Sequence, residues 1–132
     1  MYDLSKNKKQ ELLDIFGKLL IEDVRDSSLV ISTGIVEQTT VNKVDLERYS
    51  IFSTLKTEQK KAVCELLSET ITDVIYNFLD MFEANDEIVK LVLINDGKEY
   101  DMVYVSEKMG GEIARHDDEG WIQKFSEMKR FV

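Results

Sequence analysis

The chain has 132 residues, of which 43% are hydrophobic and 33% are charged. These proportions are typical of one globular domain and exclude a disordered chain, and a chain of this length can bury a core without disulfides or metal. The net charge of −9 disfavours binding to nucleic acid or to an anionic membrane surface.

The sequence carries no sign of export or membrane insertion. Its single cysteine, Cys64, cannot form an intramolecular disulfide bond, which fits a reducing compartment. The N-terminal residues lack the apolar segment of a signal peptide, and no apolar run is long enough to cross a bilayer. We therefore expect a cytoplasmic protein that does not span a membrane and that folds as one domain over residues 1–132.

The first expected element is a helix over residues 1–26. Its apolar residues recur at helical spacing, and Ser5 or Asn7 is a suitable N-cap. Gly17 interrupts this pattern, and close packing against another helix is the conventional reason for a glycine there. Turn-forming and capping residues at 25–28 predict that the helix ends at this point.

Residues 29–52 give the weakest pattern in the chain. The β-branched residues in 29–41 are compatible with one edge strand, two short strands or an irregular segment, and the sequence does not decide among them. Residues 44–52 have the apolar spacing of a short helix.

The strongest signal is a long amphipathic helix over residues 57–84, with Thr57 as its expected N-cap. No Gly or Pro interrupts it, and we expect the rest of the protein to pack on its apolar stripe. Asp80 and Glu83 lie in its last turns, where the helix dipole disfavours negative charge, so either packing overrides this cost or the acidic end has a use. The apolar stripe consists of Val63, Leu66, Leu67, Ile71, Val74, Ile75, Phe78, Leu79 and Phe82.

Residues 87–94 and 99–105 predict an antiparallel hairpin. Asp96 and Gly97 suit a two-residue type I′ turn, in which both residues have positive φ. Residues 112–115 are a candidate third strand. The cross-strand pairs predicted by this turn are Val89–Tyr104, Leu91–Met102, Val92–Asp101, Leu93–Tyr100 and Ile94–Glu99.

The last expected element is a helix over residues 120–131, with Asp117 or Asp118 as its cap. Together these elements predict an α+β fold: a long central helix with N- and C-terminal helices packed on a small antiparallel sheet. The C-terminal helix has an apolar stripe of Trp121, Ile122, Phe125 and Met128 and basic residues at Lys124, Lys129 and Arg130.

The most site-like cluster is HDDE at residues 116–119. One histidine with several carboxylates could bind a divalent cation or act in acid–base catalysis. However, consecutive residues of a polar turn rarely converge on one ion, and the chain has no second histidine. We therefore predict no metal ion, no cofactor and no catalytic residue, with a small metal-dependent enzyme using His116 and neighbouring carboxylates as the alternative.

Negative charge is concentrated in residues 80–119, which hold twelve acidic and four basic residues and so a balance of −8. Such charge can serve solubility alone, or it can form a surface that attracts a basic protein. We predict a non-enzymatic protein-binding module with the character of an inhibitor or immunity protein; a self-associating structural protein is a further alternative. The predicted binding residues are Asp80, Glu83, Asp86, Glu87, Glu99, Asp101, Asp117, Asp118 and Glu119.

Overall fold

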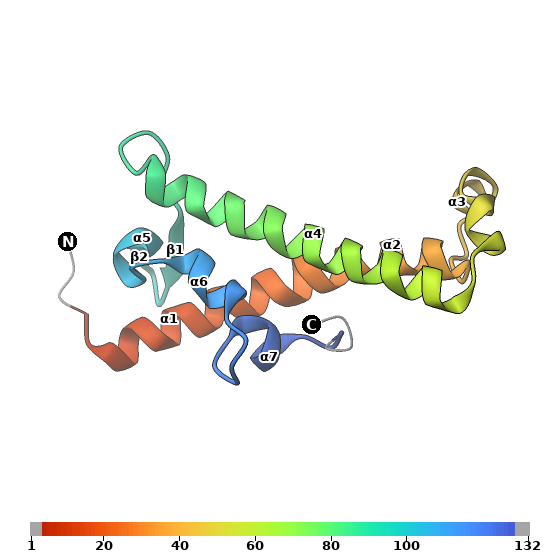
Figure 1. The fold of residues 1–132 in the computed structure, drawn as a ribbon. Coiled ribbons are helices and arrows are strands. Elements are labelled where there is room, and N and C mark those ends of the chain that lie inside the picture. The colour runs from red at the N-terminus through yellow and green to blue at the C-terminus, as the bar shows by residue number, and fades with distance from the viewer. Residues whose placement is uncertain (1–3, 129–132) are drawn as a thin grey trace.

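The computed structural model describes residues 4–128 and is built on two long helical rods that run antiparallel (Figure 1). The first rod is continuous over three segments, and the second is a single helix. A short helix and a 3-10 turn join the rods at one end of the molecule. In chain order these elements are α1 (Lys6–Leu19), the π-helical segment η1 (Leu20–Asp26), α2 (Ser27–Glu37), α3 (Lys43–Arg48), the 3-10 turn η2 (Ser50–Thr54) and α4 (Thr57–Ala84).

The two rods are in contact at α2 and diverge towards the other end, where the C-terminal elements fill the space between them (Figure 1). There α6 packs on α4 and α7 packs on α1, so the core lies between the rods. These elements are β1 (Val92–Asn95), β2 (Lys98–Asp101), α5 (Met102–Val105), α6 (Met109–Ala114) and α7 (Trp121–Phe125). The core includes Leu12, Ile21, Ile75, Leu79, Tyr100, Met102, Met109, Ile113 and Trp121.

The predicted α+β class is confirmed, since the described residues are mostly helical and carry a two-stranded antiparallel sheet. Within the described residues, no helix is both long enough and apolar enough to cross a membrane.

The N-terminal helix begins as predicted but ends later than predicted. Ser5 is its N-cap, and the Ser5 hydroxyl accepts a hydrogen bond from the backbone N–H of Lys8. The predicted end at 25–28 is wrong, because the rod continues through α2 to Glu37. The β-branched residues of 29–37 therefore form a helix, as burial against α4 outweighs their local preference for strands.

The π-helical segment η1 explains how so long a rod keeps one face buried. The buried positions recur every four residues, which is longer than the 3.6 residues of an α-turn, so a plain α-helix would rotate them out of the core. A π-helix has more residues in each turn and returns the pattern to the buried side. The positions concerned are Gly17, Ile21, Arg25, Leu29 and Thr33.

Gly17 has the close contact that the sequence predicted. A Cβ at this position would lie 2.5 Å from Nε1 of Trp121, so only glycine allows α7 to approach α1 this closely. Phe16 packs edge-on against the same indole, with ring centroids 5.8 Å apart.

The bounds predicted for the long helix are confirmed, although its N-cap is Lys56 and not Thr57. Its apolar stripe is only partly buried. Leu66, Val74 and Phe78 expose 63%, 62% and 50% of their surface, so the expectation that they pack in the core is wrong. The reason is geometric, because α4 has a single long neighbour and the C-terminal elements cover only part of the remaining stripe.

The hairpin has the predicted turn but shorter strands. Asp96 and Gly97 have φ values of 52° and 75°, as a type I′ turn requires. The predicted pairs Val92–Asp101, Leu93–Tyr100 and Ile94–Glu99 are confirmed. At the end of the strands, the Met102 backbone N–H still donates to the Leu91 carbonyl at 2.9 Å, which keeps the predicted register of this pair. The pair Val89–Tyr104 is wrong, because β1 and β2 are shorter than the predicted strands 87–94 and 99–105 and the chain forms α5 at residue 102.

The C-terminal part is more helical than predicted. The third strand at 112–115 is wrong, since these residues belong to α6 and the turn after it. A Cβ on Gly110 would lie 2.8 Å from the Tyr76 ring, so this glycine lets α6 pack against α4. The helix predicted over 120–131 ends at Phe125 and has Gly120 as its N-cap, without a side-chain cap from Asp117 or Asp118. Lys129, Arg130 and Phe131 lie outside the described residues.

Candidate functional site

The predicted acidic residues occupy different parts of the molecule. Asp80 and Glu83 lie in the last turns of α4, followed by Asp86 and Glu87 in the next loop, whereas Glu99 and Asp101 lie on β2. Residues 117–119 lie in the loop between α6 and α7, which projects on the side of the molecule opposite the end of α4 (Figure 1). The structure therefore brings residues 80–87 together but separates them from residues 117–119.

Two of these carboxylates hold neighbouring helices in place. Glu83 Oε1 accepts a 2.6 Å hydrogen bond from the backbone N–H of Met109, at the first turn of α6. Asp101 accepts from the backbone N–H of Val103 at the start of α5, and it lies 3.6 Å from Lys90 Nζ. Both therefore contribute to the fold, because they satisfy helix N-terminal N–H groups.

Asp117 forms a two-point ion pair with Arg115. The Nε and Nη2 atoms of Arg115 lie 3.0 and 2.8 Å from its two carboxylate oxygens. Hydrogen bonding from Arg115 lowers the pKa of Asp117, and the same contact raises the pKa of Arg115. His116 is exposed between them, and within residues 4–128 no group of three or more His, Cys, Asp or Glu side chains is placed to hold a metal ion.

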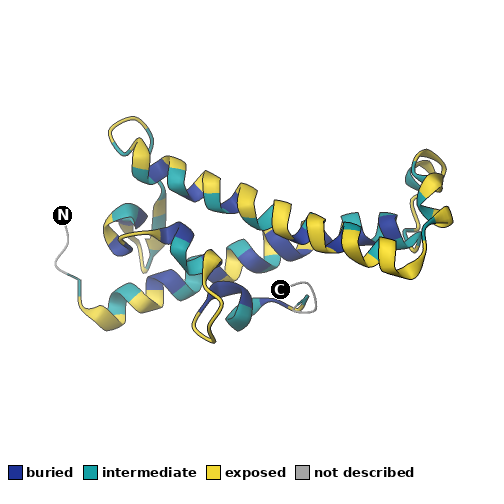
Figure 2. Cartoon of the chain, viewed as in Figure 1, coloured by how far each residue is buried: buried dark blue, intermediate teal, exposed yellow. Residues whose placement is uncertain are grey.

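The solvent side of α4 carries an acidic and an apolar surface next to each other. From residue 62 to residue 84 the helix has five carboxylates and no basic residue. Successive residues are about 100° apart around a helix, so the acidic residues gather on one side and the exposed apolar residues on the adjacent side. Figure 2 shows this outward side as exposed along its length. We call these residues the α4 face: Glu65, Glu69, Asp73 and Asp80 with Leu66, Val74, Phe78 and Met81.

A buried polar network lies on the other side of α4, centred on Arg25 of the π-helical segment. Arg25 has no exposed surface. Its Nη1 donates to Asp26 Oδ1 at 2.7 Å and to Ser126 Oγ at 2.9 Å, and its Nη2 donates to Ser68 Oγ at 3.3 Å. Asp26 also accepts from the backbone N–H of Glu127 at 2.8 Å. The network thus joins the first rod, α4 and the segment after α7.

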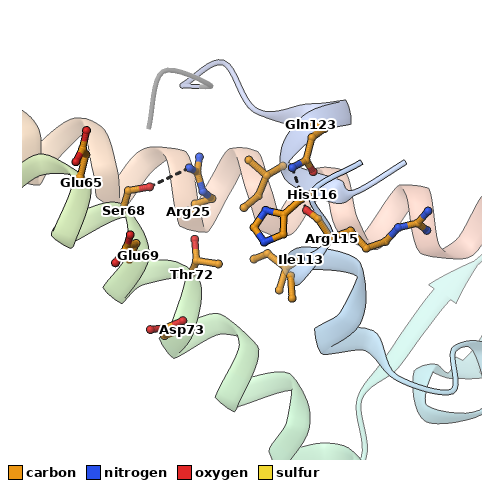
Figure 3. Close-up of a pocket in the computed structure, with 12 residues that line it drawn as sticks. Arg25, Glu65, Ser68, Glu69, Thr72, Asp73, Ile113, Arg115, His116 and Gln123 are labelled. Atoms are coloured by element: carbon orange, nitrogen blue, oxygen red, sulfur yellow. Dashed lines mark hydrogen bonds between the residues drawn. The ribbon is translucent and has the colours of Figure 1, made fainter. Parts of the chain in front are cut away.

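The same network forms the inner end of a pocket of about 470 Å³ between α4 and the C-terminal elements (Figure 3). Glu65, Glu69 and Asp73 line the pocket on the α4 side, while His116 and Gln123 line it on the opposite side. Two buried polar atoms of pocket-lining residues have no hydrogen-bond partner in the described part of the chain. They are Arg25 Nε and Gln123 Oε1.

Arg25 and Gln123 are not among the site residues predicted from the sequence. Arg25 was assigned to the end of a helix, but the four-residue spacing that runs through Gly17, Ile21 and Leu29 also passes through it. That spacing could have placed the guanidinium on the buried face. Nothing in the local sequence marks Gln123 as a pocket residue.

The fold and these surfaces define a small, mostly helical α+β protein with an acidic and apolar helix face and a charged pocket. Residues 5–123 match the model of DUF6547, a family of unknown function, and the chain therefore belongs to this family. No curated protein and no solved structure gives a match. The matched range contains all of α4 and every residue that lines the pocket.

Proposed function

We propose that the protein is a non-enzymatic binding module that docks a basic protein on the α4 face. The observation that carries this proposal is the exposure of Leu66, Val74 and Phe78 directly beside a row of carboxylates. Contiguous exposed apolar surface bordered by polar residues is typical of protein interaction sites.

The two parts of the α4 face have different roles in docking. Removing the apolar side chains from water supplies affinity, at about 25 cal/mol for each Å² of apolar surface covered. Glu65, Glu69 and Asp73 attract a basic partner over longer range and speed its association. Asp80 continues the negative surface into the last turns of the helix, and Asp86 and Glu87 extend it beyond the end of the helix.

Charge also favours a basic partner over a second copy of this chain. Each copy carries a net charge of −9, so two copies repel each other. If the basic partner is an enzyme, docking on the α4 face would inhibit that enzyme. The protein would then be an inhibitor of the immunity type. A cytoplasmic location, where Cys64 stays reduced, is part of the proposal.

The test is affinity capture from extracts of the source cell, with the wild-type protein as bait at low and high salt. A basic protein should bind at low salt and dissociate at high salt, because salt screens the charges. Two variants of the bait should no longer capture this basic protein. Glu69→Lys/Asp73→Lys should fail because it reverses the charge that attracts the partner, and Leu66→Gln should fail because it removes an apolar contact.

The matched control is Glu11→Lys/Glu47→Lys, which changes the net charge equally at exposed positions on α1 and α3. It should capture the partner nearly as well as the wild-type protein does. Equal loss in the control and in Glu69→Lys/Asp73→Lys would show that only total charge matters, and the α4 face would then not be the docking site.

A further inference from the structure

We propose that the pocket at Arg25 binds a small molecule with a carboxylate at one end and an amine at the other, such as a free lysine-like amino acid. This ligand is small and so differs from a docked protein, although the pocket shares Glu65, Glu69 and Asp73 with the α4 face. The proposal stands on the unused hydrogen-bond donors of Arg25, on the charges around the pocket and on its size.

Arg25 has hydrogen-bond donors that the described residues leave unused. A guanidinium has five N–H groups, and Nη1 of Arg25 already donates to Asp26 and Ser126. Nη2 makes one long contact of 3.3 Å with Ser68, and Nε has no partner among the described residues. Nε–H and one Nη2–H lie parallel along one edge of the guanidinium, which is the geometry that holds a carboxylate by two hydrogen bonds.

The charge balance at Arg25 favours a zwitterion over a simple anion. Asp26 lies 2.7 Å from Arg25 and already balances its positive charge. A ligand carboxylate buried at the same place would add an uncompensated negative charge, which is unfavourable in a site away from water. A ligand that brings its own cation avoids this cost, so a zwitterion fits the pocket better than a simple anion does.

The pocket also has a place for the cation. Glu69 and Asp73 line it, lie one helical turn apart and make no ion pair within the described chain. Figure 3 shows both on α4 below Ser68, which is the residue that contacts Arg25. Ser68 and Asp73 are five residues apart, which is about 7.5 Å along a helix, so the amine and the carboxylate of the ligand are separated by several bonds.

The remaining features of the pocket agree with a ligand of this size. Its volume of about 470 Å³ lies within the range of roughly 300–1,000 Å³ for small-molecule sites. Gln123 Nε2 donates to the backbone carbonyl of Arg115, which holds the amide in place and leaves Oε1 to accept from a ligand N–H. Arg25 lies in a π-helical segment, and such segments occur frequently at functional sites.

The test is a calorimetric titration of the purified chain with three probes of equal length: 6-aminohexanoate, hexanoate and hexylamine. We expect 6-aminohexanoate to bind at least tenfold more tightly than either probe with one charged group. Equal binding of the three probes, or no binding of 6-aminohexanoate, would overturn the proposal.

Two further measurements assign the contacts. The variant Glu69→Gln/Asp73→Asn should bind 6-aminohexanoate about tenfold more weakly, while the control Glu11→Gln/Glu47→Gln should bind it as the wild type does. The NMR signal of the Arg25 Nε–H group should shift when 6-aminohexanoate is added, and this readout needs no Arg25 variant that might unfold. An unmoved Arg25 signal on saturation would contradict the proposed orientation. Because the probes are small and the chain is pure, these results do not depend on whether a basic protein docks on the α4 face.

Discussion

Arg25 donates a 2.7 Å hydrogen bond to Asp26, its neighbour in the sequence, and both side chains are buried. Both residues lie in the π-helical segment η1, and Asp26 and Ser126 accept from the same Arg25 Nη1. The ion pair then serves as the anchor for Ser126 and Glu127, which follow the last described helix.

Replacing Asp26 with Ala should therefore destabilise the protein strongly. Loss of one partner leaves the other charge buried and unpaired, which costs about 3–5 kcal/mol. Urea unfolding followed by circular dichroism measures the free energy of unfolding. The control is Asp23→Ala, three residues away and exposed, which should change stability by less than about 0.5 kcal/mol. If the two variants unfold at the same urea concentration, the Arg25–Asp26 pair does not have the buried geometry described.

Alanine at Gly17 should have the opposite effect to alanine at Gly34. A Cβ at Gly17 would overlap the indole of Trp121, and overpacking of this kind costs about 1–3 kcal/mol. At Gly34 the nearest atom would be 3.8 Å away, so alanine there should stabilise α2 by roughly 0.5–1 kcal/mol through its helix preference. Thermal unfolding of the two variants checks the difference in sign. Stabilisation by Gly17→Ala would contradict the packing of α7 on α1.

Glu83 should contribute to stability although it lies at the unfavourable end of the helix dipole. Its carboxylate accepts from the backbone N–H of Met109, and loss of a helix cap costs about 1 kcal/mol. Glu83→Ala should lower the free energy of unfolding by about that amount. Asp80→Ala, one turn earlier, removes a carboxylate from the same unfavourable end without removing the cap, so it should be neutral or slightly stabilising. Unfolding in urea distinguishes the two, and equal effects would contradict the capping role.

Asp117 should titrate below the ordinary aspartate value of 3.8, because Arg115 hydrogen bonds to its ionised form. The stabilisation that goes with a lowered pKa is fully present above the unfolded value and is lost as the pH falls through the folded pKa. NMR titration of the carboxyl carbon measures this pKa. Arg115→Gln should raise it towards 3.8, whereas Arg48→Gln should leave it unchanged. An unchanged midpoint in Arg115→Gln would show that the ion pair does not persist in solution.

The parts of the fold that local chemistry determines could be predicted from the sequence. The bounds of α4 follow from its apolar period, and the hairpin turn follows from Asp96 and Gly97. The contact at Gly17 was also predicted, although the identity of its neighbour, Trp121, was not.

The parts that depend on distant residues could not be predicted. The β-branched segment of α2 is helical because α4 covers it, and residues 112–114 are helical because α6 packs on α4. The pocket draws on Arg25, Asp73, His116 and Gln123, which are far apart in the sequence. The nine predicted acidic residues were chosen by composition alone, and only their positions in space separate residues 80–87 from residues 117–119.

The connection between the two rods should be the first part of the molecule to open. Neither α3 nor the 3-10 turn after it contains a buried residue, so little apolar surface opposes their unfolding. Backbone amides at residues 43–54 should therefore exchange with solvent deuterium quickly, while those around Arg25 should exchange only when the whole protein unfolds. Such a gradient would let residues 43–54 open while the contact between α2 and α4 stays closed, so this end of the chain can yield locally while its charged pocket stays intact.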